Sequence, residues 1–156
     1  MIMSRTDSRA VYGIDDAIER TKRYIDAGAE ICFADGIGTR EELEKFAKEL
    51  SGSGAYLVAN MIEGGKTPLI PAKELEQMGF SLVFWACSAV YTISKALYDL
   101  FGNLAQDGTT EKSLDRMIEF SQFNSMIGLD TYKEYERKYK VDRDCLLYTS
   151  DAADEA

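Results

Sequence analysis

The chain contains no histidine among its 156 residues. This absence excludes Ser-His-Asp and Cys-His catalysis, as well as any metal site that depends on an imidazole ligand. Cysteine is also scarce, and the three residues lack the spacing of metal ligands. Cys32 and Cys87 stand in apolar segments, where cysteine usually behaves as a small buried hydrophobic residue. We therefore expect structural thiols.

Basic residues are in the minority, with 18 Lys and Arg against 27 Asp and Glu and a formal net charge of −9. Nucleic acids and anionic membrane surfaces both attract an excess of positive charge, so neither is an expected partner. No apolar run is long enough to span a bilayer, and the first residues lack the pattern of a secretion signal. The sequence therefore predicts a cytoplasmic protein.

The last segment, CLLYTSDAADEA at residues 145–156, does not continue the amphipathic pattern that precedes it. Its letters match the translation of a transposon-based sequencing adaptor. We interpret residues 145–156 as adaptor read-through and expect them to be disordered.

The rest of the chain shows a repeated switch of hydrophobic period, in which short apolar runs alternate with amphipathic stretches. The expected strands are residues 2–6, 30–34, 56–60 and 81–86. The helices expected to follow them are residues 15–27, 39–50, 72–78 and 89–106. Strands at a near-constant interval, each followed by a helix, indicate parallel βα units of a barrel or an open sheet, of which we favour the barrel.

Further signals define the elements more closely. Thr39 and Glu42 have the spacing of a capping box at the start of a helix. The run at residues 82–85 is apolar on both faces, which is typical of a parallel strand that is buried on both sides. Two shorter helices are expected at residues 113–127 and 129–140. The predicted organisation is four βα units over residues 1–106 and C-terminal helices over residues 107–144.

In α/β folds of this kind the ligand binds at the carboxyl ends of the strands. Three such ends carry Arg5, Asp35 and Asn60. Arg can clamp a carboxylate with two hydrogen bonds, Asn can add a donor, and Asp can orient a hydroxyl or a water. Together they suit a small dicarboxylate. On spacing alone a structural role is equally open, with Arg5 paired to Asp7 and Asn60 capping a turn.

The segment Gly64-Gly65-Lys66-Thr67 is similar in composition to a phosphate-binding loop. A Walker loop needs four residues between its glycines and a helix directly afterwards, whereas Pro68 follows here. We therefore predict no nucleotide binding and expect the glycines to let this loop fold back over the barrel mouth.

Three segments of the chain resemble a single enzyme superfamily. They are RTDSRAVYGIDDAIERTKRYIDAGAE (5–30), ANMIEGGKTPL (59–69) and FNSMIGLDTYKEYERKY (123–139). All three are similar to the second half of the isocitrate lyase and phosphoenolpyruvate mutase superfamily, chiefly its methylisocitrate, 2,3-dimethylmalate and petal-death-protein lyases. The resemblance implies the second half of a TIM (β/α)8 barrel, with a half barrel at residues 1–106 followed by C-terminal helices.

The resemblance also implies which parts lie outside this chain. In the superfamily, the first four βα units precede the Arg-Thr-Asp strand and carry the Mg²⁺ ligands and the mobile loop with the catalytic Cys. We therefore assign no metal ligand and no catalytic residue to this chain, and we expect it to be inactive as given.

Within the chain, Arg5 and Asn60 match family positions that hold a substrate carboxylate, and Asp35 matches a position where relatives carry Glu or His. Ile62 stands where methylisocitrate lyases have Thr. The implied activity is Mg²⁺-dependent retro-Claisen cleavage of a methylisocitrate- or alkylmalate-like 2-hydroxy acid with two or three carboxylates. The family also implies a homo-oligomer that exchanges the helix at residues 89–106, whose apolar seam is Val90, Ile93, Leu97, Leu100 and Leu104.

Two alternatives remain open. The first is a phosphonomutase or an oxaloacetate hydrolase of the same superfamily, which the loop with the catalytic Cys would distinguish from a lyase. The second is a non-catalytic half barrel that acts as a binding module. Two bare edges make a four-stranded parallel sheet prone to association, which argues against this second alternative.

Overall fold

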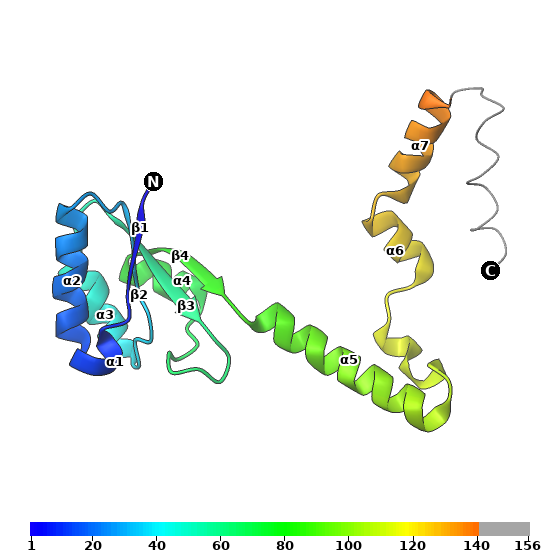
Figure 1. Ribbon diagram of the computed structural model, residues 1–156, viewed down its shortest axis with the longest axis horizontal. Helices are drawn as coiled ribbons and strands as arrows, with labels where there is room; N and C mark the ends of the chain where they lie inside the picture. The colour runs from blue at the N-terminus through cyan, green and yellow to red at the C-terminus, as the bar shows by residue number, and fades with distance from the viewer. Residues whose placement is uncertain (141–156) are drawn as a thin grey trace. The chain divides into compact units, whose positions relative to one another are not determined.

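The computed structural model describes residues 1–140 (Figure 1). The segment interpreted as adaptor read-through lies outside the described residues. The chain divides after Tyr98 into two units, which are described separately below. Among residues 1–140, no helix combines the length and the apolar character needed to cross a membrane.

The first unit is built on a sheet of four parallel strands that pair in chain order. The strands are β1 (Met3–Thr6), β2 (Ile31–Ala34), β3 (Tyr56–Met61) and β4 (Phe80–Trp85). The helices that follow them are α1 (Arg9–Tyr12), α2 (Ile14–Asp26), α3 (Arg40–Glu49), α4 (Ala72–Met78) and α5 (Ser88–Asp107). The prediction of four parallel βα units followed by further helices is confirmed.

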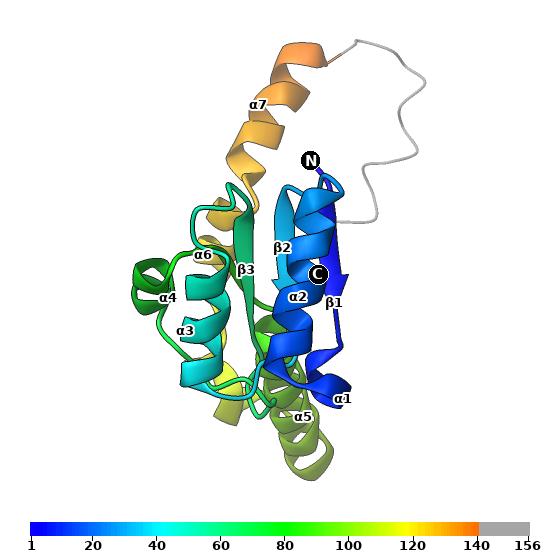
Figure 2. The same ribbon diagram turned by 90° about the vertical axis from the view of Figure 1, so that its left-hand side faces the viewer.

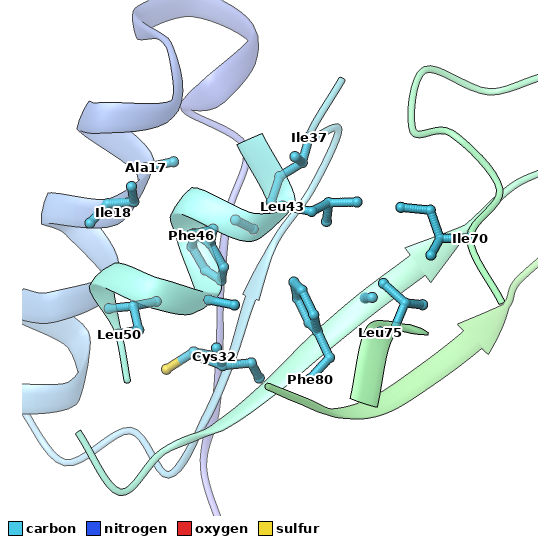
Figure 3. Close-up of a cluster of buried hydrophobic side chains, with 14 of the residues drawn as sticks. Ala17, Ile18, Cys32, Ile37, Leu43, Phe46, Leu50, Ile70, Leu75 and Phe80 are labelled. Carbon is cyan, nitrogen blue, oxygen red and sulfur yellow. The ribbon is translucent and has the colours of Figure 1, made fainter. Parts of the chain in front are cut away.

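Helices α2, α3 and α4 pack side by side against one face of the sheet (Figures 1 and 2). The core between the two layers includes Phe46 of α3, which is fully buried and stacks on Phe80 of β4 with ring centroids 6.5 Å apart (Figure 3). Cys32 is also fully buried in this core and has a free thiol, as expected for a structural cysteine. Burial of these apolar side chains is the main source of stability for the unit.

The opposite face of the sheet carries Arg5, Phe33, Val58 and Leu82, which are aligned across the four strands. The sequence pattern predicted burial of β4 on both sides, and this prediction is wrong for Leu82, which is 46% exposed. The reason is that within residues 1–98 the packed helices α2, α3 and α4 all lie on the other face.

Helix α3 begins at a cap that is close to the predicted one. Thr39 Oγ1 accepts a hydrogen bond from the Glu42 N–H at 3.1 Å. The Glu42 carboxylate, however, accepts from the Gly38 N–H at 2.8 Å and from Arg9 Nε and Nη2 at 3.0 and 2.7 Å. Glu42 therefore joins α3 to α1 as well as capping its own helix.

Two elements differ from the expectation. Helix α1 was not predicted, because one helical turn is too short to show a hydrophobic period. The helix expected at residues 113–127 is wrong: the second unit has a 3₁₀ helix η1 (Glu111–Arg116) and a separate α6 (Phe120–Met126), followed by α7 (Leu129–Tyr139). The apolar residues change phase between Ile118 and Phe120, so one continuous helix would place them on different faces.

Candidate functional site

Three strand ends meet at one edge of the sheet. Arg5 lies near the end of β1, Asp35 follows β2 directly, and Asn60 lies near the end of β3. The Asp35 N–H donates to the carbonyl of Thr6 at 2.9 Å, which continues the β1–β2 pairing to this point. Because the strands are parallel, these polar side chains share the carboxyl edge of the sheet, where ligands bind in α/β folds.

A pocket of about 310 Å³ opens at this edge. This volume is at the small end of the range for ligand pockets, which suits a small molecule. Asp35 and Asn60 both line the pocket, and Arg5 is bonded to two of the residues that do. The lining residues are Asp7, Ala10, Asp35, Gly36, Asn60, Ile62, Lys66 and Thr67.

The Arg5 guanidinium is held on three sides. Its Nε and Nη2 donate to the Asp7 carboxylate at 3.1 and 2.7 Å, and Nη2 also donates to Asp35 Oδ2 at 2.7 Å. The guanidinium carbon lies 5.2 Å from the centre of the buried Phe33 ring. The structural alternative, an Arg5–Asp7 ion pair, is therefore present in the structure and extends to Asp35.

This arrangement leaves part of Arg5 open. None of the described residues accepts a hydrogen bond from Nη1, so two of its five N–H groups remain available to a ligand. The hydrogen bond from Arg5 is the main cause that lowers the pKa of Asp7, and the same bond raises the pKa of Arg5. Asp7 thus stays ionised and keeps the guanidinium charged and oriented at neutral pH.

Two buried side-chain acceptors lie at the end of β3 and just after it. Asn60 Oδ1 and Glu63 Oε2 are inaccessible to solvent, and neither has a hydrogen-bond partner among the described residues. The other oxygen of Glu63 accepts from Ser88 Oγ, which is the main cause that lowers the pKa of Glu63. An unsatisfied buried acceptor costs about 1–3 kcal/mol. Asn60 Oδ1, which belongs to a pocket-lining residue, is therefore a position that a ligand donor can satisfy.

The loop after β3 supplies the far side of the pocket. Gly64 has a φ of +71°, and the Gly65 N–H donates to the carbonyl of Ile62 at 3.0 Å, which closes a tight turn. A Cβ on Gly65 would lie only 3.0 Å from that carbonyl oxygen, a tight contact, so the turn favours glycine at this position. The turn brings Lys66 and Thr67 to the pocket. The sequence analysis did not identify these two residues as part of the site. Their position on the loop that follows a strand end was the signal that could have identified them.

The described residues do not form a metal centre. Among residues 1–140, no group of three or more Cys, Asp and Glu side chains is arranged to hold a metal ion. The two carboxylates at the pocket, Asp7 and Asp35, are both bonded to Arg5. The described residues therefore do not fit Mg²⁺.

Comparison with known proteins gives a consistent result over most of the chain. The sequence profile of the phosphoenolpyruvate phosphomutase family matches residues 1–105. The chain is 40% identical over 143 residues to 2,3-dimethylmalate lyase of Eubacterium barkeri, covering 92% of this chain and 48% of the lyase. It is 38% identical over 148 residues to carboxyvinyl-carboxyphosphonate phosphorylmutase of Arabidopsis thaliana, covering 93% of this chain and 43% of the mutase.

Solved structures agree with the sequence comparison. A crystal structure of 2,3-dimethylmalate lyase, described as a member of the PEP mutase/isocitrate lyase superfamily, superposes with a TM-score of 0.77 at 29% identity. The superposition covers 88% of this chain and 47% of that structure. The chain thus spans about half the length of the relatives that it matches.

Proposed function

Since this chain belongs to the phosphoenolpyruvate mutase and isocitrate lyase superfamily, we propose that it supplies the substrate-binding edge of a Mg²⁺-dependent carbon–carbon lyase. Its four parallel βα units are those of a half TIM barrel of this superfamily. The proposed substrate is a methylisocitrate- or alkylmalate-like 2-hydroxy acid with two or three carboxylates. The ligands of the metal ion then come from the other half of the barrel in the parent enzyme.

The observation that supports this proposal is the pair of open hydrogen-bonding positions at the pocket edge. Arg5 Nη1 offers two N–H donors, and Asn60 Oδ1 is a buried acceptor without a partner among the described residues. A 2-hydroxy acid carries both complementary groups, a carboxylate for Arg5 and a hydroxyl that can donate to Asn60. The two residues would orient the acid for cleavage through proximity, without themselves transferring a proton.

Asp35 has a different part in the proposal. Its Oδ2 is bonded to Arg5 at 2.7 Å, so it positions the guanidinium at the same time as it lines the pocket. Its side chain is one methylene shorter than that of a glutamate, so it reaches less far into the pocket than a glutamate at this position would.

The phosphonomutase alternative also has a specific observation in its favour. The phosphorylmutase relative is nearly as similar to this chain as the lyase is, at 38% against 40% identity. A phosphonate anion would use the same open donors of Arg5. The two activities differ in the bond that breaks. A lyase breaks a carbon–carbon bond, whereas a mutase breaks a bond to phosphorus.

The test is an assay of the parent enzyme with both substrate classes. With Mg²⁺ and 2,3-dimethylmalate, formation of a 2-keto acid is expected, and with phosphoenolpyruvate no new phosphorus NMR signal is expected. The substitution Arg5→Lys should lower the cleavage rate by about 10- to 100-fold, because lysine keeps the positive charge but lacks the planar fork of donors that fixes the contact. The matched control is Arg23→Lys on α2, which should leave the rate unchanged. Signals of a rearranged phosphonate without keto acid would replace the lyase by the mutase.

An assay of chain 1–156 by itself provides a second test of the proposal. Chain 1–156 is expected to show no turnover of alkylmalates with Mg²⁺ above a control without enzyme. Turnover by this chain alone would contradict the assignment of the metal site to other parts of the parent enzyme.

We also propose that the parent enzyme is a homo-oligomer that exchanges helix α5. The support is an apolar seam on α5 that is open to solvent in the described chain, with Val90 61% and Ile93 57% exposed. Burying such side chains against a second subunit would be favourable. Analytical ultracentrifugation of the parent should show an oligomer. A monomer would indicate that α5 packs only within its own barrel.

A further inference from the structure

Of the cationic groups around the pocket, Lys66 has no ion-pair partner among residues 1–140. Arg5 is bonded to the carboxylates of Asp7 and Asp35, which together exceed its charge. Lys66 lines the same pocket and forms no ion pair with any described residue. Because no described carboxylate pairs with it, the Lys66 ammonium is available to an anionic ligand in this pocket.

The loop that carries Lys66 is fixed at both ends. Met61 before the loop and Ile70 after it are both buried, and the Ile70 N–H donates to Met61 Sδ at 3.5 Å. Between them, the turn from Ile62 to Gly65 is closed by a backbone hydrogen bond. The position of Lys66 relative to Asn60, on the strand that begins this loop, is therefore set by the backbone, while its side chain is exposed and free to adjust.

We propose that Lys66 binds a second carboxylate of the substrate and so selects dicarboxylates over monocarboxylates. This inference rests on the proposed function, in which Arg5 and Asn60 hold the 2-hydroxy acid end. Lys66 lies on the loop after β3, whereas Asp7 and Asp35 follow β1 and β2, so Lys66 would hold the second carboxylate from the β3 side of the pocket. A lysine is a compact charge on a flexible stem, which accommodates carboxylates at somewhat different distances.

A titration of chain 1–156 with two acids separates the role of Lys66 from that of Arg5. Malate carries a 2-hydroxy acid end and a second carboxylate, whereas lactate carries the 2-hydroxy acid end alone. Amide-resolved NMR detects weak binding and reports the loop and the strand ends separately. Malate should bind wild type at least about tenfold more tightly than lactate.

Lys66→Gln should weaken malate binding by about tenfold and leave lactate binding unchanged, because only malate has a group for Lys66. Lys66→Arg should retain the preference for malate. The matched control is Lys73→Gln on α4, which removes the same charge from a residue outside this pocket. It should leave both affinities unchanged, so a general effect of net charge is separated from a local contact.

The outcomes distinguish this inference from the proposed function. If Lys66→Gln weakens malate and lactate equally, or weakens neither, the selective role of Lys66 is refuted. In that case the proposed function stands as long as malate binding still depends on Arg5. If wild type binds neither acid at any concentration tested, both the proposed site and the role of Lys66 are refuted.

Discussion

The contact between Glu42 and Arg9 predicts a measurable loss of stability when its charge is removed. The Glu42 carboxylate accepts two hydrogen bonds from Arg9 and one from the Gly38 N–H, and both side chains are less than a quarter exposed. In Glu42→Gln the amide oxygen can still accept from Gly38, but the bonds from Arg9 lose their ionic partner. A hydrogen bond to a charged group contributes about 1.5–3 kcal/mol against about 1 for a neutral pair, so we expect a loss of about 1–2 kcal/mol.

The same contact makes this loss depend on pH. Desolvation raises the pKa of Glu42, but the hydrogen bonds from Arg9 and Gly38 outweigh it, so the pKa lies below the ordinary value. A carboxylate with a lowered pKa contributes stability that is fully present above its unfolded pKa of about 4.3 and is lost as the pH falls through the folded value. The difference between wild type and Glu42→Gln should therefore be constant near neutral pH and shrink below about pH 4.

Urea unfolding of chain 1–156, followed by circular dichroism at neutral and acidic pH, measures this difference. The control is Glu44→Gln on the same helix, where the carboxylate is about half exposed and pairs with Arg40. An exposed pair of this kind contributes less than about 1 kcal/mol. The reasoning is refuted if Glu42→Gln costs no more than Glu44→Gln, or if its cost grows as the pH falls.

Three further predictions concern the core, the α1–α3 contact and the pocket. Phe46→Ala should cost about 3–5 kcal/mol in the same unfolding assay, because the ring is fully buried, and a loss below about 1 kcal/mol would contradict the assigned core. Gly38→Ala should place a Cβ 2.4 Å from Arg9 Nη2 and displace it from Glu42, so its cost should be smaller in the Glu42→Gln background; strictly additive costs would disprove the coupling. Asp7→Asn should weaken malate binding several-fold in the NMR titration, since it removes the carboxylate that orients Arg5; an unchanged affinity would show that Asp35 and Phe33 hold Arg5 without it.

The sequence was sufficient to predict a helix or a strand where a hydrophobic pattern extends over the whole element. The apolar stripe of α3 and the cap at Thr39 identified a helix whose bounds the structure moves by only one residue at each end. The parallel order of the strands also followed from the alternation of runs and helices, because such connections place each strand beside the preceding one.

Long-range contacts of single side chains could not be derived in this way. Arg5 pairs with Asp35 as well as with Asp7 because β2 lies beside β1. The spacing of residues along the chain does not predict this contact between strands. The sequence indicated no role for Lys66 at the pocket, because its place there depends on the tight turn at Gly65. The break at Met117 was missed for a similar reason, since a shift of apolar phase is easily read as one longer helix.

The strand order of the sheet has a consequence for how the chain acquires its fold. Among the described strands, β2, β3 and β4 each pair with the strand before them, at a separation of about 25 residues. Pairings at this separation close shorter loops than pairings between distant segments, so they cost less chain entropy to form. During synthesis, β1 and β2 can pair once α2 has left the ribosome, and each later βα unit can add to a template that already exists.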